Sequence, residues 1–253
     1  MTILNDTVLE SNKYLKLNFG GGDLSSDAGL LLIKEFACKL GFVNILKKEI
    51  KTNDSASFRF HKDDENLWQI IYQILGAYFE DDCADELTND PILTAVLAKN
   101  ALASQPTLSR FFNRLDDTTL NQFYDLMRRF RKVVYSIKKP EMILLALDST
   151  LLNTYGHQEG EDFNFHYQDH RYHPLVCYDG ITGDLLKIQL RNRTDYSSTG
   201  VRDFLQPLPN EFGNDYPNIP LLLRGDSGFT KPELYHQRET NGVSYAIRLK
   251  ENG

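Results

Sequence analysis

The sequence is poor in cysteine and has no long apolar run. Its three cysteines, Cys38, Cys83 and Cys177, are odd in number and far apart, so neither a disulfide framework nor a cysteine-based zinc site is expected. The longest apolar run, residues 142–147, is far shorter than the roughly 20 residues that a membrane helix needs. The N-terminal residues also lack the basic and then apolar pattern of a secretory signal. These absences predict a cytoplasmic protein with no membrane partner.

The overall charge is negative, but it is unevenly distributed. The 253 residues are 41% hydrophobic and 25% charged, which is ordinary globular composition for one elaborated domain or two modest ones. The formal charge of −7 argues at first against a nucleic-acid partner. However, residues 51–100 carry 4 basic and 10 acidic side chains, whereas residues 101–140 carry 8 basic and 3 acidic ones. The total charge therefore says little about any one surface.

Residues 1–140 show the periodicity of helices. The spacing predicts helices that start after Ser25-Ser26-Asp27 and near Asp63, and others over 91–99, 107–115 and 118–136. The helix from Asp63 is expected to bury Leu67, Ile71, Ile74, Leu75 and Tyr78. The long helix is expected to turn inward Leu120, Phe123, Tyr124, Met127, Phe130 and Val134. The sequence therefore predicts an all-helical N-terminal region that ends near residue 140.

After Pro140 the pattern changes to short apolar runs separated by turns. Strands are expected over residues 142–148, 173–179, 185–191, 220–226 and 243–249. The turn DGITGD at 179–184 predicts a hairpin between the second and third strands. Helices are expected over 198–205 and from Pro232 onward. Residues 141–253 therefore read as an α/β domain with a mixed sheet.

Two aspartates, Asp148 and Asp226, each follow a predicted buried strand. Functional groups in α/β sheets gather at such strand ends. If the first and fourth strands are neighbours, the two carboxylates meet at one edge and become ligands for magnesium. Two metal ions about 4 Å apart can activate a nucleophilic oxygen and stabilise the leaving oxygen of a phosphodiester. The strand order and the two aspartates match the ribonuclease H-like fold.

Several segments make the resemblance specific. They are ALDST (146–150), YGHQEG (155–160), HYQDHRYHPLVCYDGITGDLL (166–186), LLLRGDSGFTKPELY (221–235) and VSYAIRLKENG (243–253), with N-terminal features at 20–36, 77–91 and 104–115. This pattern resembles bacterial insertion-sequence transposases of the DDE type, most of all the insertion-sequence family numbered thirteen-eighty. The resemblance implies that Asp148 and Asp226 are the first two catalytic acids and that Mg²⁺ is the cofactor, with Mn²⁺ as a substitute. It also implies double-stranded DNA partners, namely terminal repeats and target, and a homodimer in synapsis.

The chain departs from this family at the third acid. The resemblance places that residue, a glutamate on a later helix, beyond Gly253. Glu233, Glu239 and Glu251 do not match its position. The chain is therefore expected to be a C-terminally truncated transposase with impaired or no strand transfer, because losing a metal-site partner costs about 10- to 100-fold in affinity or activity. The alternative is a non-catalytic DNA-binding remnant that binds element ends or interferes with an intact transposase.

Basic residues suggest where DNA would bind. No acid interrupts the cluster Arg128, Arg129, Arg131, Lys132, Lys138 and Lys139, which is either a solvated helix face or a phosphate-contacting surface. Residues 101–115 weakly resemble a helix-turn-helix with Thr107, Ser109 and Arg110 near base edges, although packing of Leu108, Phe111 and Phe112 explains most of that pattern. From position alone, three further residues are expected to neutralise phosphate charge: Arg224, Arg248 and Lys250.

Two other interpretations are less favoured. Residues 225–228 resemble the serine-nucleophile segment of trypsin-like proteases, but no histidine stands in a matching context and Phe229 replaces the expected glycine. Four of the six histidines fall within 17 residues: His157, His166, His170 and His173. Zinc ligands usually come as close pairs with cysteine or carboxylate partners. Loop histidines that contact phosphate or pack against tyrosines are therefore favoured over a zinc site.

Overall fold

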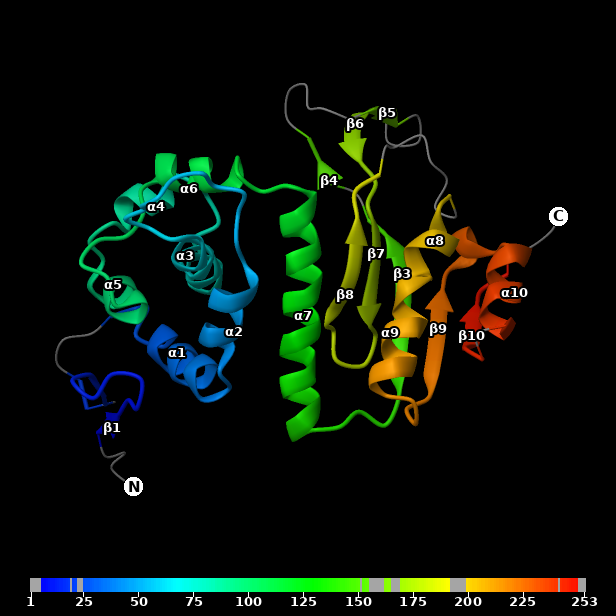
Figure 1. Cartoon of the computed structure of the whole chain (residues 1–253), viewed down its shortest axis with the longest axis horizontal. Helices are drawn as coiled ribbons and strands as arrows, with labels where there is room; N and C mark the ends of the chain where they lie inside the picture. The colour runs from blue at the N-terminus through cyan, green and yellow to red at the C-terminus, as the bar shows by residue number, and fades with distance from the viewer. Residues whose placement is uncertain are drawn as a thin grey trace. The chain divides into compact units, whose positions relative to one another are not determined.

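The computed structural model describes most of the chain (Figure 1). The described residues are 6–18, 20–21, 25–150, 152–154, 162–164, 169–191, 199–240 and 242–249. The chain divides into two compact units, Met1–Val133 and Val134–Gly253, which are called unit 1 and unit 2 below. Within the described residues, no helix has the length and apolar character needed to cross a membrane.

Unit 1 is built from helices. A small antiparallel hairpin comes first, formed by β1 (Thr7–Val8) and β2 (Lys16–Leu17). The helices are α1 (Leu30–Lys39), α2 (Phe42–Glu49), α3 (Asp63–Leu75), α4 (Cys83–Glu86), α5 (Pro91–Leu97), α6 (Gln105–Phe112) and the first part of α7 (Asp117–Ile137). They enclose a core around Leu46, Leu93 and Phe111, and Phe42 stacks on Phe130 with ring centroids 4.2 Å apart.

The helix starts show how local sequence sets these boundaries. The Asp90 carboxylate accepts hydrogen bonds from the amides of Ile92 and Leu93, at 2.9 and 2.7 Å, so it caps α5. Helix α1 starts after Ser25-Ser26-Asp27 as expected, but none of these side chains caps it. Its capping position is Gly29, without a side-chain cap bond, and the Asp27 carboxylate accepts a hydrogen bond from the Tyr78 hydroxyl at 2.8 Å. The Asp27 side chain therefore makes a long-range contact.

The inward faces of two helices differ from the expected ones. In α3, Ile74 and Leu75 are exposed, and Tyr78 lies beyond the end of the helix. The buried residues of α3 are Asn66, Leu67, Trp68, Gln69, Tyr72 and Gln73. In α7, Leu120 and Val134 are exposed, and the buried residues are Thr119, Leu126, Arg131 and Tyr135. The spacing of apolar residues predicted the buried faces of α3 and α7 incorrectly, because several buried positions in these helices are polar.

The sheet of unit 2 has five strands in the order β10-β9-β3-β7-β8. These are β3 (Ile143–Ser149), β7 (Leu175–Asp179), β8 (Leu185–Gln189), β9 (Leu221–Gly225) and β10 (Ser244–Ile247). β7 is antiparallel to both β3 and β8, whereas β9 is parallel to both β3 and β10. The prediction of a ribonuclease H-like mixed sheet is confirmed, with the first and fourth predicted strands adjacent.

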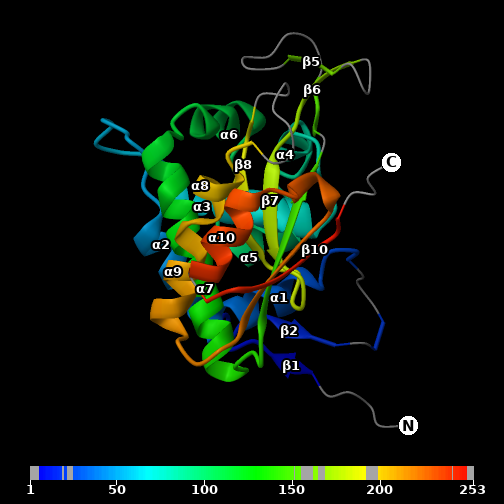
Figure 2. The same cartoon turned by 90° about the vertical axis from the view of Figure 1, so that its right-hand side faces the viewer.

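Helices cover one side of this sheet. Figures 1 and 2 both show α8 (Val201–Leu205), α9 (Pro207–Asp215) and α10 (Pro232–Thr240) on the same side. The buried strand residues Ile143, Leu145 and Leu147 pack in one core with residues of these helices such as Phe204 and Phe212. Because side chains alternate along a strand, Asp148 faces the opposite side of the sheet. The described helices α8, α9 and α10 therefore do not cover the face that carries Asp148.

Two features of unit 2 were not expected. Helix α9 has proline at its first position, where a missing amide hydrogen does no harm, and it buries Leu208 and Phe212. A three-stranded sheet has the order β4-β6-β5, formed by β4 (Leu152–Asn153), β5 (Asp162–Asn164) and β6 (Asp169–Tyr172).

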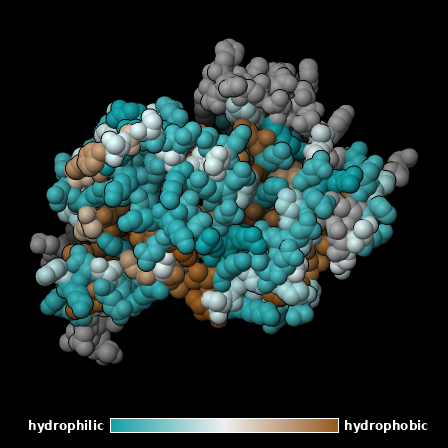
Figure 3. Space-filling model, in the orientation of Figure 1, coloured by the Kyte–Doolittle hydropathy of each residue, from teal (hydrophilic) through white to brown (hydrophobic). Residues whose placement is uncertain are grey.

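The surface seen in Figure 3 is mostly hydrophilic, as expected when the apolar side chains lie in the cores.

Candidate active site

The pairing of β3 with β9 brings the two predicted aspartates together. The register pairs Ala146 with Arg224 in parallel strands. Continued by two residues, it sets Asp148 opposite Asp226, and neighbouring strands run about 5 Å apart. Both side chains line the same cavity, on the side of the sheet away from the helices. The strand order therefore gathers two carboxylates that are far apart in the sequence.

Each aspartate is oriented by a backbone amide. The Asp226 carboxylate accepts a hydrogen bond from the Gly228 amide at 2.8 Å and so caps η1 (Ser227–Phe229), a short 3₁₀ helix. The Asp148 carboxylate accepts one from the Ser149 amide at 2.7 Å. Both side chains are exposed. The cap at Asp226 is the structural role that sequence alone would assign to it, and it leaves the carboxylate accessible to a ligand.

The cavity has a volume of about 620 Å³ and carries charges of both signs. It is lined by Ala146, Leu147, Asp148, Tyr178, Asp179, Gly180, Gly183, Arg224, Gly225, Asp226 and Arg248. The backbone of Arg248 is tied to the site, because its amide donates to the Gly225 carbonyl at 3.3 Å and its carbonyl accepts from the Thr230 hydroxyl at 3.0 Å. The structure thus places Arg224 and Arg248 beside the aspartates. Lys250 lies outside the described residues.

The donor set suits a hard divalent cation. Mg²⁺ is usually held by one or two carboxylates, with water and substrate phosphates as its other ligands. Asp148 and Asp226 supply such a pair in an open cavity. In the part of the chain that the structure describes, no group of three or more His, Cys, Asp or Glu side chains could hold a metal. Of the histidine cluster, His157 and His166 lie outside the described residues, as does the side chain of His170.

Asp179 lines the same cavity but has a structural role that the sequence reading missed. Its side chain is fully buried and accepts hydrogen bonds from the Ile181 amide at 3.1 Å, the Thr182 hydroxyl at 3.0 Å and the Tyr135 hydroxyl at 3.3 Å. These donors occupy the carboxylate and fix the turn between β7 and β8. The Asp-Gly pair that predicted the hairpin was the signal for this role.

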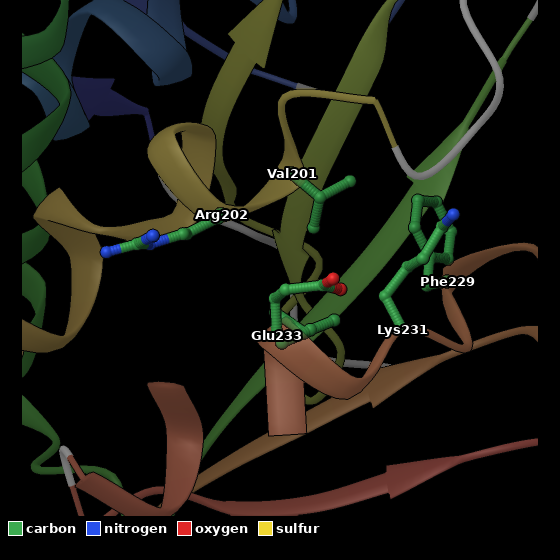
Figure 4. A pocket seen from close by; sticks show the side chains of 6 residues that line it. Val201, Arg202, Phe229, Lys231 and Glu233 are labelled. Carbon is green, nitrogen blue, oxygen red and sulfur yellow. The ribbon is translucent and has the colours of Figure 1, made fainter. Parts of the chain in front are cut away.

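Neither Glu233 nor Glu239 lines the cavity that holds Asp148 and Asp226. Glu233 lines a separate cavity of about 170 Å³ together with Val201, Phe229 and Lys231. Figure 4 shows Arg202, which also lines this cavity, extending away from the other labelled side chains. The Glu239 carboxylate accepts a hydrogen bond from the Tyr245 hydroxyl at 2.9 Å. Glu251 lies outside the described residues.

The basic residues of α7 do not share one face. Arg129 is exposed and pairs with Glu49 at 3.1 Å, and Lys132 is exposed as well. Arg128 is half-buried, whereas Arg131 is only 5% exposed. The separation follows from helical geometry, because Arg131 lies one turn before the buried Tyr135. A phosphate-contacting surface on α7 would therefore consist of exposed residues other than Arg131.

Helix α6 has one packed face and one outer face. Leu108 and Phe111 are buried, as the packing interpretation expected, but Phe112 is exposed, as are Ser109 and Arg110. Thr107 is half-buried, and its hydroxyl accepts a hydrogen bond from the Arg110 guanidinium at 3.2 Å. The helix begins at Gln105, two residues earlier than expected. Its contact with base edges stays a prediction.

A family model described as "Transposase DDE domain group 1" matches residues 8–253. No match was found among curated proteins. Among solved structures, a piggyBac transposase synaptic complex with hairpin DNA is similar at 13% identity and a TM-score of 0.41. The match covers 85% of this chain and 48% of that one, so the chain spans about half of its length. A Mos1 transposase paired-end complex with left transposon end matches at 11% identity and a TM-score of 0.30, over 90% of this chain and 68% of that one.

Proposed function

The chain belongs to the family of transposase DDE domains, group 1, and from this we propose that it acts in DNA transposition by metal-dependent cleavage and transfer of phosphodiester bonds. One observation carries the proposal for this chain: the parallel pairing of β3 with β9, with Asp148 and Asp226 in one open cavity. Within the family, the proposed assignment is a bacterial insertion sequence of the group numbered thirteen-eighty. Its DNA partners would be the terminal repeats and the target, with a homodimer in synapsis.

In the proposed mechanism, Asp148 and Asp226 hold divalent cations, Mg²⁺ or Mn²⁺. When bound, a pair of such ions supplies an activated oxygen nucleophile and stabilises the leaving oxygen. The chain's own contribution is position and charge. The Gly228 amide orients Asp226, and the sheet fixes the spacing of the two carboxylates. Arg224 and Arg248 line the cavity, where a guanidinium can pair with a phosphate oxygen of the DNA.

We further propose that the 253 residues cleave DNA weakly by themselves. The resemblance to insertion-sequence transposases implies three acids, and the described lining of the cavity holds two that match them. Loss of a metal ligand should cost at least the 10- to 100-fold that loss of its supporting partner costs. The alternative function is DNA binding without cutting, favoured by the basic, exposed residues of α6 and α7.

Metal binding and nicking together test the proposal. Isothermal titration with Mn²⁺ should show binding to the wild-type chain, and binding should be lost in Asp148→Asn and Asp226→Asn. Any Mg²⁺-dependent nicking of a labelled duplex should be lost in the same variants. Asp203→Asn is the matched control, because Asp203 is an exposed aspartate of α8 that is not in the cavity lining.

The outcomes separate the alternatives. Mn²⁺ binding or nicking that survives Asp148→Asn would overturn the assignment of the site. DNA binding by a chain that neither binds metal nor cuts would favour the non-catalytic function. Robust nicking by the 253-residue chain would contradict the expected impairment and show that the two aspartates suffice.

A further inference from the structure

The connection between α2 and α3 exposes two aromatic side chains on a positively charged loop. Residues 51–62 read KTNDSASFRFHK, and the connection projects from the helices of unit 1 (Figure 2). Phe58 is 78% exposed, and Phe60 is exposed as well. The segment carries Lys51, Arg59 and Lys62 against one acid, Asp54, although residues 51–100 as a whole are strongly acidic. The loop therefore carries a net positive formal charge within an acidic part of the sequence, and it has aromatic rings at its tip.

Side-chain contacts brace this loop at its tip and at its base. The Arg59 guanidinium makes two hydrogen bonds to the Asp54 carboxylate, at 2.6 and 2.8 Å, and the Ala56 amide donates to the same carboxylate at 3.0 Å. At the base, the Lys99 ammonium donates to the Phe60 carbonyl at 3.2 Å and lies 5.5 Å from the centroid of its ring. A loop held in this way presents Phe58 with little ordering left to occur on binding.

The same loop is joined to α6. The Arg114 guanidinium donates to the Asp63 carboxylate at 2.9 Å and to the Thr52 hydroxyl at 3.3 Å, at the two ends of the loop. It also donates to the Arg110 carbonyl at 3.0 Å, on α6. A network of paired basic and acidic side chains therefore links the aromatic loop to α6, whose outer face carries the exposed Arg110.

We propose that residues 51–62 form a DNA-contacting loop, in which Phe58 stacks on a base that is not held in a duplex while the exposed Lys51 and Lys62 contact the backbone. This inference rests on the proposed function in transposition. Aromatic side chains bind unpaired bases regardless of sequence because every base has a π-face, and cations beside them attract phosphates. An intact duplex hides its base faces by stacking, so frayed or single-stranded DNA is the better ligand for this loop.

A second copy of the chain is a poorer partner for the tip. A stable protein interface buries about 800 Å² on each partner, whereas two phenylalanine side chains offer about 400 Å². The small apolar area therefore disfavours a contact between copies.

The chain provides a matched control for the experiment. Phe79 is 70% exposed, also in unit 1, but it is followed by Glu80, Asp81 and Asp82. Its surroundings repel DNA, so truncation there removes an exposed ring of the same kind without removing a DNA contact. Because both rings are exposed, neither Phe58→Ala nor Phe79→Ala should change the thermal unfolding of the chain.

Fluorescence anisotropy with the full chain tests the proposal, using a labelled single strand of about 30 nucleotides and the corresponding duplex. Phe58→Ala should weaken binding to the single strand by at least about fivefold and affect the duplex less. Phe58→Trp should restore the affinity, and Phe79→Ala should leave both affinities unchanged.

Other results would overturn the inference. Equal affinities of Phe58→Ala and wild type would refute it while leaving the proposed function standing, because metal binding at Asp148 and Asp226 is tested separately. Unchanged DNA binding with altered sedimentation would identify the tip as a contact between copies instead. A wild-type chain that binds neither DNA probe would overturn both the loop and the proposed role in transposition.

Discussion

Replacing Gln69 by leucine should destabilise unit 1 more than most single changes, although the substitution adds apolar surface. Gln69 lies in α3 with 2% of its surface exposed, and its side-chain amide makes two hydrogen bonds to Ala103, 34 residues later. Its nitrogen donates to the Ala103 carbonyl and its oxygen accepts from the Ala103 amide, both at 2.8 Å. The pair fixes the backbone just before α6, next to the capping position Ser104.

The expected magnitude follows from the groups left behind. Ala103 is fully buried, so Gln69→Leu leaves its amide hydrogen and its carbonyl without a hydrogen-bond partner and away from water. Each such group costs about 1–3 kcal/mol, and the added apolar burial returns about 1 kcal/mol. The free energy of unfolding should therefore fall by about 1–5 kcal/mol. With a urea slope of about 2 kcal/mol per molar, the unfolding midpoint should drop by roughly 0.5–2.5 M.

Urea unfolding followed by tryptophan fluorescence measures this directly. Trp68 is the single tryptophan of the chain, and it is buried beside Gln69 in α3, so its emission reports unit 1. Gln73→Leu is the control, because Gln73 is also buried in α3 but its side chain makes no hydrogen bond within the described residues. Gln69→Leu as stable as the wild type, or a Gln73→Leu variant that loses as much, would refute the reasoning.

The remaining predictions concern a buried carboxylate, a surface ion pair and a basic helix. Asp179→Ala should lower the free energy of unfolding by about 2–4 kcal/mol, because the hairpin donors lose their acceptor, and Asp179→Asn should cost less. Thermal unfolding followed by circular dichroism compares the two, and equal losses would contradict the prediction. The Arg59 hydrogen bonds hold the pKa of Asp54 well below its usual range. The stabilisation from this pair is therefore complete above the unfolded pKa of about 4 and is lost as the pH falls through the lower folded value. An NMR titration of the carboxyl carbon should show this low pKa, and Arg59→Gln should raise it; a normal pKa in the wild type would contradict the contact. Charge reversal at Arg128 and Arg129 should lower DNA affinity and its salt dependence, by about one unit of slope for each lost phosphate contact. Unchanged affinity in a folded variant would remove α7 from the DNA surface.

The sheet was predictable because its signals are local. Each strand is a short apolar run closed by turn-forming residues, and the Asp-Gly turn defined the hairpin of β7 and β8. The chain order of strands and helices then limited the topology to a few choices, of which the ribonuclease H-like one is confirmed. The shared position of Asp148 and Asp226 followed from that topology, without any local signal that joins them.

The sequence-based predictions failed where contacts between residues far apart in the sequence determine a helix or the burial of a side chain. Helix α9 contains two prolines and a glycine within nine residues, yet burial of Leu208 and Phe212 stabilises it. The burial of Gln69 has no local signal in the sequence, because its partner, Ala103, is 34 residues away. Burial of Arg131 likewise cannot be read from a run of basic residues, since the run fixes charge but not which way each side chain points.

The central position of β3 has a consequence for the order in which the protein assembles. The β7–β8 hairpin closes over a few residues, whereas β3 meets β9 only after the chain between Asp148 and Asp226, 78 residues apart, has been made and ordered. Closing a loop of that length costs about 4 kcal/mol of entropy beyond a constant, so this pairing should form late in folding. A nascent chain on the ribosome carries Asp148 long before its partner exists. Any ligand that needs both carboxylates therefore binds only after β3 and β9 have paired, and the rate at which that affinity develops measures this late step of folding.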